Sequence, residues 1–494
     1  MCMEMRGVES CGSKTTTTKF LGELKTNRAI RQEFLGLVGF AAPIFCGPCA
    51  CVEVDTVAEV PKMSKTSHVV KCQPNEAEDF KLYVKAAPME YDEMARAFRD
   101  ATFGFNKEEG TSLLDIGAGN GRFLMEILRS GVSISKYKAY EPDPILVAEL
   151  EELIQQSDIL DEDKTSIENS TFDGANEKFD VVLISHSLYG IKDKYQFISE
   201  ALKCVADGGI LLLFHRSGKT IPDLSTKLYK DNVLHHVETR CFDIVMDKLN
   251  DEELDRLSRY TNKDLACRAR QKIQFSFDFL AIEPGLGRLS LEESRKRVSF
   301  AARSATPKAV VQPKTVVGIQ ACVDAALRNH GGASKLTVLG GGHSNNCFSD
   351  DAIVVDMANW RSITVDPHDN LVVVGGGATV GAITEAAEKY GLIVPLGDRP
   401  SIGAGLILQG GINHFMRRYG LACDNLVRVV YVSPKGQLCT ASSDQELWPF
   451  RGAGSNFGVV VELTLKAYPV EHVFAVSREY SMHNSDCGPI KALH

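Results

Sequence analysis

Basic charge is in short supply in this sequence. Its 494 residues contain 55 Lys and Arg against 64 Asp and Glu, which gives a formal net charge of −9. Proteins that bind nucleic acid in general present a strongly basic face. The acidic balance therefore argues against nucleic acid as a partner, and small-molecule substrates are the partners that we expect.

A regular cysteine framework is also missing. The 14 cysteines are scattered, which favours reduced thiols in a cytosol-like compartment. The only cluster, Cys46-Gly-Pro-Cys49-Ala-Cys51, lacks the second cysteine pair or the histidines of a zinc site. We therefore expect no metal site and a cytoplasmic location.

An apolar run without helix breakers is the third feature that the sequence lacks. The most apolar stretch, residues 34–52, barely reaches the length needed to span a bilayer. It is interrupted by glycine and proline, at Gly36, Gly39, Pro43, Gly47 and Pro48. We therefore expect a poorly ordered extension or a gene-model artefact, and a leader or membrane-associating segment stays open as the alternative.

The length predicts two or more domains, at about 100–200 residues per domain. Changes in apolar patterning and Gly/Pro punctuation place the boundaries. We expect a poorly structured extension at 1–75, a first domain at 76–287, a linker at 288–300, a second domain at 301–472 and a tail at 473–494.

The first domain opens with the order strand, glycine loop, helix. The segment Ser112–Phe123 holds Asp-Ile-Gly-Ala-Gly-Asn-Gly, and a helical apolar pattern follows it. The next predicted strand, 137–140, ends in Glu141, roughly twenty residues after the loop, where a carboxylate can accept hydrogen bonds from both hydroxyls of a ribose. This is the first βα unit of a nucleotide-binding fold.

The acidic Asp115 before the first glycine, and the later apolar segments in order, resemble class I S-adenosylmethionine-dependent methyltransferases over residues 80–285. Those segments are 179–185, 208–214 and 275–282. The resemblance implies an α/β Rossmann-like methyltransferase domain that binds S-adenosyl-L-methionine. The cofactor-binding residues that it implies are Asp115, Gly117, Gly119, Gly121, Glu141, Ser170, Thr171 and Ser185.

The acceptor of the methyl group is not specified by these residues. His186, Tyr189 and His215 stand near strand ends where an acceptor would sit. His186 also occupies the place of a substrate-contacting side chain in histamine-type N-methyltransferases, which this stretch faintly resembles. A histidine satisfied by neighbouring loop groups is the competing interpretation.

In the second domain, a short apolar strand leads into Leu339-Gly340-Gly341-Gly342-His343-Ser344-Asn345-Asn346. Glycines at such a point permit positive φ and leave no Cβ in the way of a ligand. Successive backbone N–H groups then form an anion-binding concavity that suits a pyrophosphate. His343 would stand beside the bound group with a nucleophilic ring nitrogen. Helices are expected at 317–329 and 380–390.

Residues 305–470 resemble the PCMH-type FAD-binding domain of berberine-bridge-enzyme-like FAD-linked oxidases, an α+β fold, with several glycine-rich motifs in the same order. The resemblance implies FAD as the cofactor, attached covalently at His343. The FAD-binding residues that it implies are Gly340, Gly341, Gly342, His343, Ser344, Asn345, Gly403, Gly405, Gly410, Asn425 and Val427.

Two departures from that family are visible. Many relatives carry a cysteine where this sequence has Arg399, so we expect a single covalent link at His343. The family continues into a substrate-binding domain that supplies the catalytic base, whereas this sequence stops at His494, soon after the last matching strand.

Three functional interpretations remain open from the sequence. The chain is a bifunctional enzyme joining methyl transfer to FAD-dependent oxidation, a methyltransferase with an incomplete FAD module that does not catalyse, or a fused or truncated gene model. The sequence specifies neither the methyl acceptor nor the oxidised substrate, nor the oligomeric state.

Overall fold

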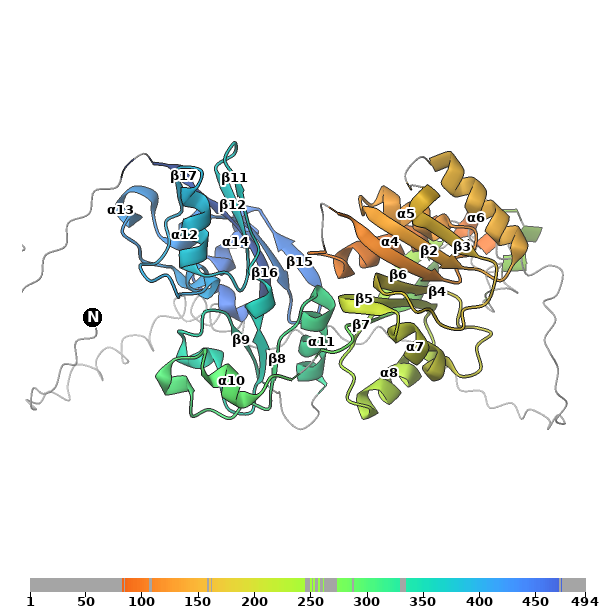
Figure 1. The fold of residues 1–494 in the computed structure, drawn as a ribbon, viewed down its shortest axis with the longest axis horizontal. Helices are drawn as coiled ribbons and strands as arrows, with labels where there is room; N and C mark the ends of the chain where they lie inside the picture. Colours follow the sequence, from red (N-terminus) through yellow and green to blue (C-terminus); the bar gives the residue numbers. More distant parts are fainter. Residues whose placement is uncertain are drawn as a thin grey trace, which may run out of the picture. The chain divides into compact units, whose positions relative to one another are not determined.

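The computed structural model describes residues 82–472, apart from gaps at 84, 106–108, 158–159, 161, 245–248, 251, 254–255, 258–260, 262–272, 287, 329–334 and 471. The predictions for segments 1–75, 34–52, 46–51 and 473–494 lie outside the described residues. Along the described chain, an α/β domain is followed by an α+β domain (Figure 1).

The first domain is built on a seven-stranded sheet with the order β3-β2-β1-β4-β5-β7-β6. Neighbouring strands are parallel except at β7, which runs antiparallel to both of its neighbours. The strands are β1 (Thr111–Ile116), β2 (Ile134–Tyr140), β3 (Thr165–Glu168), β4 (Phe179–Ser185), β5 (Val205–Arg216), β6 (His236–Ile244) and β7 (Ile273–Ile282).

The central strands of this sheet are apolar on both faces, as expected when helices cover both sides of a parallel sheet. Successive side chains of a strand point to opposite faces. Val181 and Leu183 of β4 accordingly belong to the core on one face, and Val182 and Ile184 to the core on the other. The continuous apolar run of β4 is thus explained by burial on both sides.

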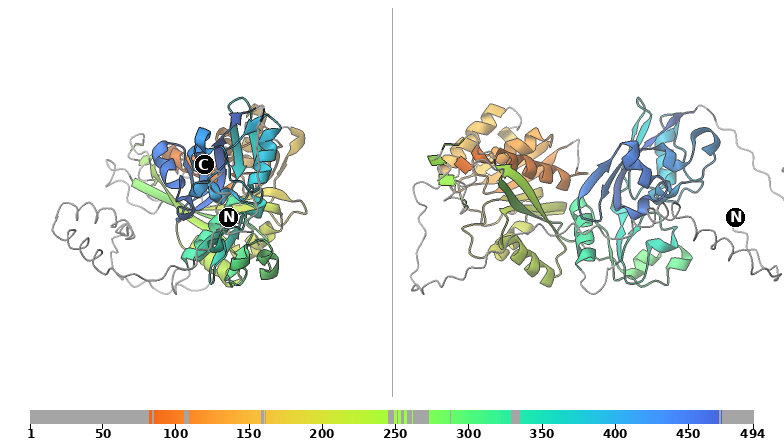
Figure 2. Two further views of the ribbon diagram at one scale, coloured as in Figure 1. Left: turned by 90° about the vertical axis from the view of Figure 1, so that its left-hand side faces the viewer. Right: turned by 180° about the vertical axis from the view of Figure 1, so that it is seen from behind.

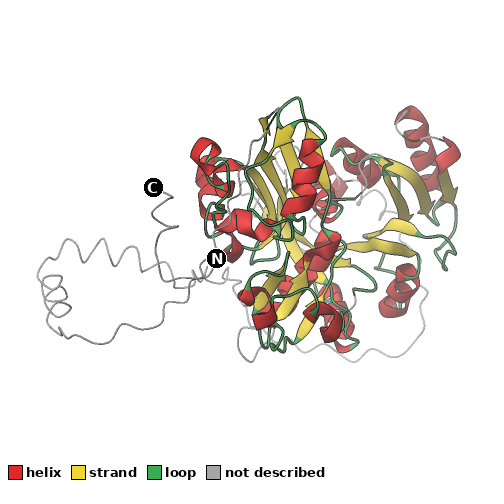
Figure 3. Cartoon of the chain, turned by 60° about the vertical axis from the view of Figure 1, so that its left-hand side comes forward, coloured by secondary structure: helices red, strands yellow, loops and turns green. Residues whose placement is uncertain are grey.

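Two groups of helices cover these faces (Figures 1 and 3). One group comprises α4 (Pro88–Ala101), α5 (Arg122–Arg129) and α6 (Pro144–Ser157), and the other α7 (Lys194–Leu202) and α8 (Thr220–Lys230). In α4, Pro88 stands in the first turn, where its missing N–H costs no helical hydrogen bond.

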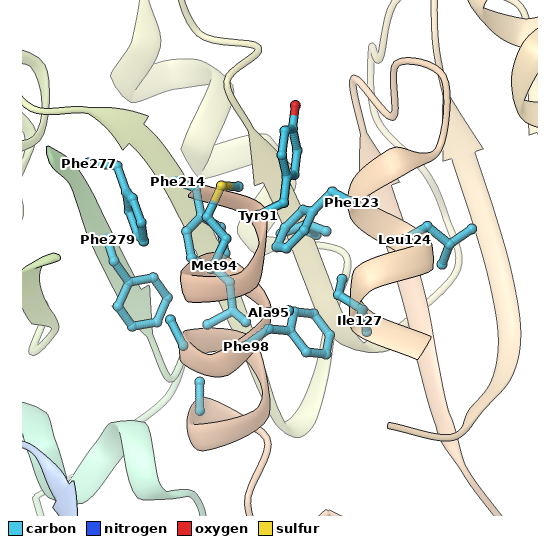
Figure 4. Packing of buried hydrophobic residues seen from close by; sticks show 14 of the residues in the cluster. Tyr91, Met94, Ala95, Phe98, Phe123, Leu124, Ile127, Phe214, Phe277 and Phe279 are labelled. Atoms are coloured by element: carbon cyan, nitrogen blue, oxygen red, sulfur yellow. The ribbon is translucent and has the colours of Figure 1, made fainter. Parts of the chain in front are cut away.

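An aromatic cluster joins α4 and α5 to the sheet. Figure 4 shows Met94 and Phe98 of α4 packed with Phe123 of α5 and Phe214 of β5. The rings of Phe123 and Phe214 meet edge to face, with centroids 5.3 Å apart. This packing fixes α4 over the sheet, near the ends of β4 and β5 that carry candidate site residues.

The second domain contains a small parallel sheet and a larger antiparallel sheet. The parallel sheet has the order β8-β10-β9, and the antiparallel sheet has the order β11-β12-β16-β14-β15. A further pair joins β13 (Leu392–Ile393) and β17 (Tyr468–Pro469). The other strands are β8 (Ala309–Val311), β9 (Leu336–Leu339), β10 (Ile353–Asp356), β11 (Ile363–Asp366), β12 (Leu371–Gly375), β14 (Leu426–Val432), β15 (Leu438–Ala441) and β16 (Val459–Lys466).

The helices of the second domain are short, as Figure 2 shows from two further sides. They are α10 (Leu291–Arg295), α11 (Val316–Leu327), α12 (Val380–Glu388), α13 (Met416–Tyr419) and α14 (Asp444–Leu447). The Thr315 hydroxyl accepts a hydrogen bond from Gly318 N–H and so caps α11. The helices predicted at 317–329 and 380–390 are confirmed, each ending two residues earlier than expected.

The α/β and α+β folds predicted from the sequence are confirmed. The predicted last strand of the first domain is present as β7, but it lies between β5 and β6. We did not predict β6, because the polar residues of 236–244 outnumber its buried apolar ones.

Candidate functional sites

The glycine loop of the first domain follows β1 directly. Gly117, Gly119 and Gly121 have positive φ values of 79°, 58° and 78°, which side chains disfavour. A Cβ on Gly117 would overlap the Ser187 side chain, whereas a Cβ on Gly119 would meet nothing within 4 Å. The loop backbone is therefore packed on one side and open at Gly119, as a cofactor-binding loop requires.

Glu141 lies against this loop. Its carboxylate accepts hydrogen bonds from Gly119 N–H at 2.8 Å and from Asp143 N–H at 3.0 Å. The fold thus brings the acidic residue at the end of β2 to the open glycine, as the spacing in the sequence suggested. This arrangement fits a carboxylate that receives the ribose of a nucleoside cofactor beside the loop.

Asp115 is the buried acid of the site. Its Oδ2 accepts a hydrogen bond from the Tyr137 hydroxyl at 3.1 Å, while its buried Oδ1 has no partner among the described residues. Burial raises the pKa of Asp115 to about 7, against the opposing effect of the Tyr137 hydrogen bond. An unpaired buried acceptor next to the loop fits a donor group on a bound cofactor.

The remaining predicted S-adenosylmethionine contacts lie at the same sheet edge. Ser170 and Thr171 are exposed just beyond β3, and Ser185 is the last residue of β4. The carboxyl ends of β1 to β4 meet at one edge because these strands are parallel, and ligands of open α/β sheets bind there.

His186 follows β4 in a left-handed backbone conformation, with φ of 51°. Its Nδ1 lies 3.4 Å from the Tyr189 hydroxyl, and its Nε2 lies 3.5 Å from Glu90 Oε1. Burial first, and then the positive charges of Arg216 and His215, lower the pKa of His186 to about 3. The imidazole is therefore neutral at physiological pH.

Glu90 was missed by the sequence reasoning. It stands on α4 among apolar residues and is only 2% exposed. The signal in the sequence is a weak one: Glu90 lies four and eight residues before Met94 and Phe98, on the apolar stripe of the helix.

In the second domain, separate glycine segments converge. Gly341 packs so closely on Gly403 that a Cβ on either would overlap the other's backbone. Gly342 has φ of 76° and lies against the backbone of Arg297 in the same way. The two glycine-dense segments of the sequence therefore pack directly on each other. Their backbones are in contact where a bound dinucleotide would need close approach without side chains in the way.

His343 lies on the exposed rim of this cradle. Its Nε2 is 2.9 Å from the Ser401 hydroxyl, which belongs to the segment just before Gly403. Ser344 and Asn345 are also exposed, and Asn345 Oδ1 accepts a hydrogen bond from the Ser299 hydroxyl at 2.7 Å. The loop thus exposes His343 to solvent, while its glycines pack on the backbones of Gly403 and Arg297.

The other predicted FAD contacts differ in what their atoms can do. Gly405 and Gly410 have open space where a Cβ would stand, and Val427 is half-buried in β14. The Asn425 side chain donates to the carbonyls of Tyr419 and Leu421 and accepts from the Tyr468 hydroxyl. Asn425 therefore shapes the loop at 419–426, and only its backbone is left to face a ligand.

Arg399 is exposed in the turn before Ser401. Among the residues described, no group of three or more His, Cys, Asp or Glu side chains could hold a metal ion. The described helices include none with the length and apolar character needed to cross a bilayer.

Comparison with known proteins identifies both halves of the chain. Residues 89–243 match a methyltransferase domain family, and residues 307–442 match an FAD binding domain family. The chain therefore carries a methyltransferase domain followed by an FAD-binding domain of PCMH type.

The FAD-binding half has homologues among FAD-linked oxidoreductases of the berberine-bridge-enzyme-like family. An FAD-linked oxidoreductase of Dictyostelium discoideum is 36% identical over 173 residues, which cover 34% of this chain and 38% of that protein. The (R)-6-hydroxynicotine oxidase of Paenarthrobacter nicotinovorans is 36% identical over 140 residues, 27% of this chain and 31% of the relative. Berberine bridge enzyme-like 6 of Arabidopsis thaliana is 32% identical over 179 residues, 34% and 32% of the two chains.

Among solved structures, 6-hydroxy-D-nicotine oxidase of Arthrobacter nicotinovorans is 29% identical, covering 36% of this chain and 40% of that one, with a TM-score of 0.34. The chain thus spans between 31% and 38% of the length of the three curated relatives named above.

Proposed function

We propose that this protein is a bifunctional enzyme acting on small molecules, with S-adenosylmethionine-dependent methyl transfer in the first domain and an FAD-dependent oxidoreductase module in the second. FAD is attached through His343 alone, since Arg399 stands where a second, cysteine link would be. We place the protein in the cytoplasm. Six cysteines among the described residues are free thiols, which is consistent with this location.

The observation that carries the proposal is that one chain contains two glycine-rich loops, each packed against a second element of its own domain's predicted cofactor site. In the first domain, Glu141 and Gly119 meet across the sheet edge, and Asp115 Oδ1 is left for a donor. In the second, Gly341 and Gly403 meet backbone to backbone below His343.

In the first domain, Asp115, Glu141 and the loop amides would hold S-adenosylmethionine at the carboxyl edge of the sheet. The cofactor supplies an electrophilic methyl group on a sulfonium. The protein's task is mainly to orient the acceptor in line with that group and to exclude water, because positioning supplies much of the acceleration of such displacements.

In the second domain, the loop amides of 340–344 would hold the pyrophosphate, and His343 would fix the flavin ring. Flavin supplies hydride or electron transfer once bound. His343 would join the 8α-methyl carbon with loss of one hydrogen from that methyl group and one from the imidazole nitrogen, and dioxygen would take up the two electrons and two protons as hydrogen peroxide. The bond from Nε2 to Ser401 leaves Nδ1 as the ring nitrogen that we expect to attach.

The alternative is a methyltransferase whose FAD-binding module does not catalyse, or a fused or truncated gene model. This alternative requires only the FAD binding domain that residues 307–442 match.

Two measurements on the purified full-length protein distinguish these possibilities. Yellow colour that stays with acid-precipitated protein, and is lost in His343→Ala, would establish covalent flavin at His343. Calorimetric binding of S-adenosylmethionine, weakened in Glu141→Ala, would establish the first site. Colourless protein that binds S-adenosylmethionine would favour the alternative methyltransferase, and failure to bind either cofactor would reject enzymatic function for both domains.

A further inference from the structure

Glu90, which is buried, and His186, which is half-buried, form a polar pair at the edge of the methyltransferase sheet. Glu90 Oε1 and His186 Nε2 are both buried, lie 3.5 Å apart, and neither makes a hydrogen bond within the described residues. A polar atom that reached one of them would be within reach of the other. The Glu90 carboxylate also has a hydrogen bond with Tyr83, so the unmet hydrogen-bonding capacity lies at Glu90 Oε1 and His186 Nε2, where a third polar group could bind.

The charged and titratable groups around the pair come from three elements. The charge of Arg216 and a hydrogen bond with Tyr83 lower the pKa of Glu90 against the effect of burial. The charges of Arg216 and His215 lower the pKa of His186. Tyr189 stacks parallel to His186, and its ring centroid lies 4.5 Å from that of His215. The pair is therefore enclosed by aromatic and basic side chains, with Tyr189, which is 53% exposed, on its outer side.

The pair is linked through the backbone to the glycine loop. Ser187, next to His186, donates a hydrogen bond to Ile116 O at 2.9 Å and packs where a Cβ on Gly117 would lie. The segment that carries His186 thus also packs against the glycine loop at Gly117. A group bound at His186 would stand beside whatever that loop holds.

The backbone at His186 supports a functional role for the position. A non-glycine residue with positive φ is uncommon, and strained residues persist where the surrounding structure enforces them, often at active sites. His186 has φ of 51° and its imidazole lies against Glu90, whereas glycine or asparagine would adopt this backbone conformation at lower cost.

We propose that Glu90 and His186 bind the nucleophile of the methyl acceptor, and that this acceptor is a small molecule whose nucleophilic nitrogen or oxygen carries a hydrogen. The inference rests on the proposed methyl transfer. Glu90 is the proton acceptor, and neutral His186 is the second contact that aligns the nucleophile.

The reaction balances with these two residues alone. The acceptor's lone pair forms the bond to the methyl carbon as the carbon–sulfur bond breaks, and that electron pair stays on sulfur as a neutral thioether. The hydrogen on the acceptor nitrogen or oxygen passes as a proton to the Glu90 carboxylate. A base in contact with the acceptor typically contributes about 10²–10⁴-fold to the rate.

The test uses full-length protein and measures S-adenosylhomocysteine released with a panel of acceptors. Imidazole, aniline, phenol and catechol carry the required hydrogen, whereas trimethylamine and N-methylimidazole offer a nitrogen without one. The variants are Glu90→Gln, which keeps shape, and His186→Asn, which tolerates positive φ. Glu93→Gln on the same helix is the matched control, since Glu93 pairs at the surface with Arg96.

We expect turnover with at least one hydrogen-bearing acceptor, a rate that rises with pH as Glu90 deprotonates, and a loss of about 10²-fold in Glu90→Gln with that pH step removed. Glu93→Gln should retain the profile. S-Adenosylmethionine binding that is unchanged in Glu90→Gln would show that the fold and cofactor site remain.

Several outcomes would overturn the inference. These are turnover confined to the hydrogen-free acceptors, no turnover with any panel member while S-adenosylmethionine binds, or an unchanged pH profile in Glu90→Gln. If the wild-type protein does not bind S-adenosylmethionine, the proposed methyl transfer fails and this inference fails with it.

Discussion

His343 and Ser401 join the two glycine segments of the second domain by a side-chain contact, with Nε2 2.9 Å from the Ser401 hydroxyl. The residues are 58 positions apart in sequence, and the backbones of their neighbours Gly341 and Gly403 also touch. The contact fixes the imidazole on the rim of the cradle and selects which ring nitrogen faces away from Ser401.

Ser401→Ala should slow covalent attachment without abolishing it. An exposed neutral hydrogen bond contributes about 0.5–1.5 kcal/mol, so we expect attachment to slow by roughly 2–10-fold. The measurement is the time course of acid-stable flavin after FAD is added to apoprotein. A variant as slow as His343→Ala would show that Ser401 does more than orient the ring.

Gly341→Ala should destabilise the second domain. The new methyl group would overlap the backbone of Gly403, which cannot move as a side chain can, so we expect a loss of about 1–3 kcal/mol in unfolding free energy. Chemical denaturation followed by fluorescence measures this loss. Gly405→Ala is the control, because a Cβ there meets nothing within 4 Å; equal losses in both variants would contradict the explanation.

Glu90→Gln should stabilise the fold in a pH-dependent way. Burial raises the pKa of Glu90 from 4.5 to about 7, so the folded protein holds a proton that the unfolded chain has lost between these values. Stability contributed by this group is present below pH 4.5 and is lost as pH rises through 7.

The variant cannot be ionised, so it escapes that loss. We expect a gain over wild type that is absent at pH 4.5 and reaches about 1–3 kcal/mol at pH 8. Thermal unfolding at several pH values checks the sign. A gain that is the same at every pH would show that Glu90 does not titrate between these values.

Arg399→Cys should raise the flavin reduction potential. The substitution restores the residue that makes a second covalent link in many relatives, and we expect a single link to leave the potential lower. Redox titration of both reconstituted proteins tests this, with mass spectrometry to show the thioether. A doubly linked variant without a higher potential would refute the expectation.

Residues that act through the backbone were the most predictable parts of this protein. Glycines before Glu141 and before His343 predict tight turns and close ligand approach, because glycine adopts positive φ at the lowest cost and has no Cβ. Their convergence was less accessible. Nothing in the sequence says that Gly341 meets Gly403, since that contact depends on how β9 and the 401–411 segment are placed.

Residues whose role depends on burial were harder to predict. Glu90 differs from a solvated helix glutamate only in the face of α4 that it occupies, and the sequence does not reveal that the Asn425 amide donates to the Leu421 carbonyl. β6 was missed because it is a polar outer strand paired only with β7. Such features are decided by tertiary packing, which overrides local pattern.

The position of β7 has a consequence for synthesis of the chain. β7 lies between β5 and β6, although both precede it in sequence. β5 ends at 216 and β7 at 282, so 282 − 216 = 66 residues separate these ends. At about 5–20 residues per second, a ribosome needs roughly 3–13 s to make them. During that interval the apolar edge of β5 lacks its partner, and β6 has no strand to join. Protection of this edge by a chaperone would therefore matter most before residue 282 emerges.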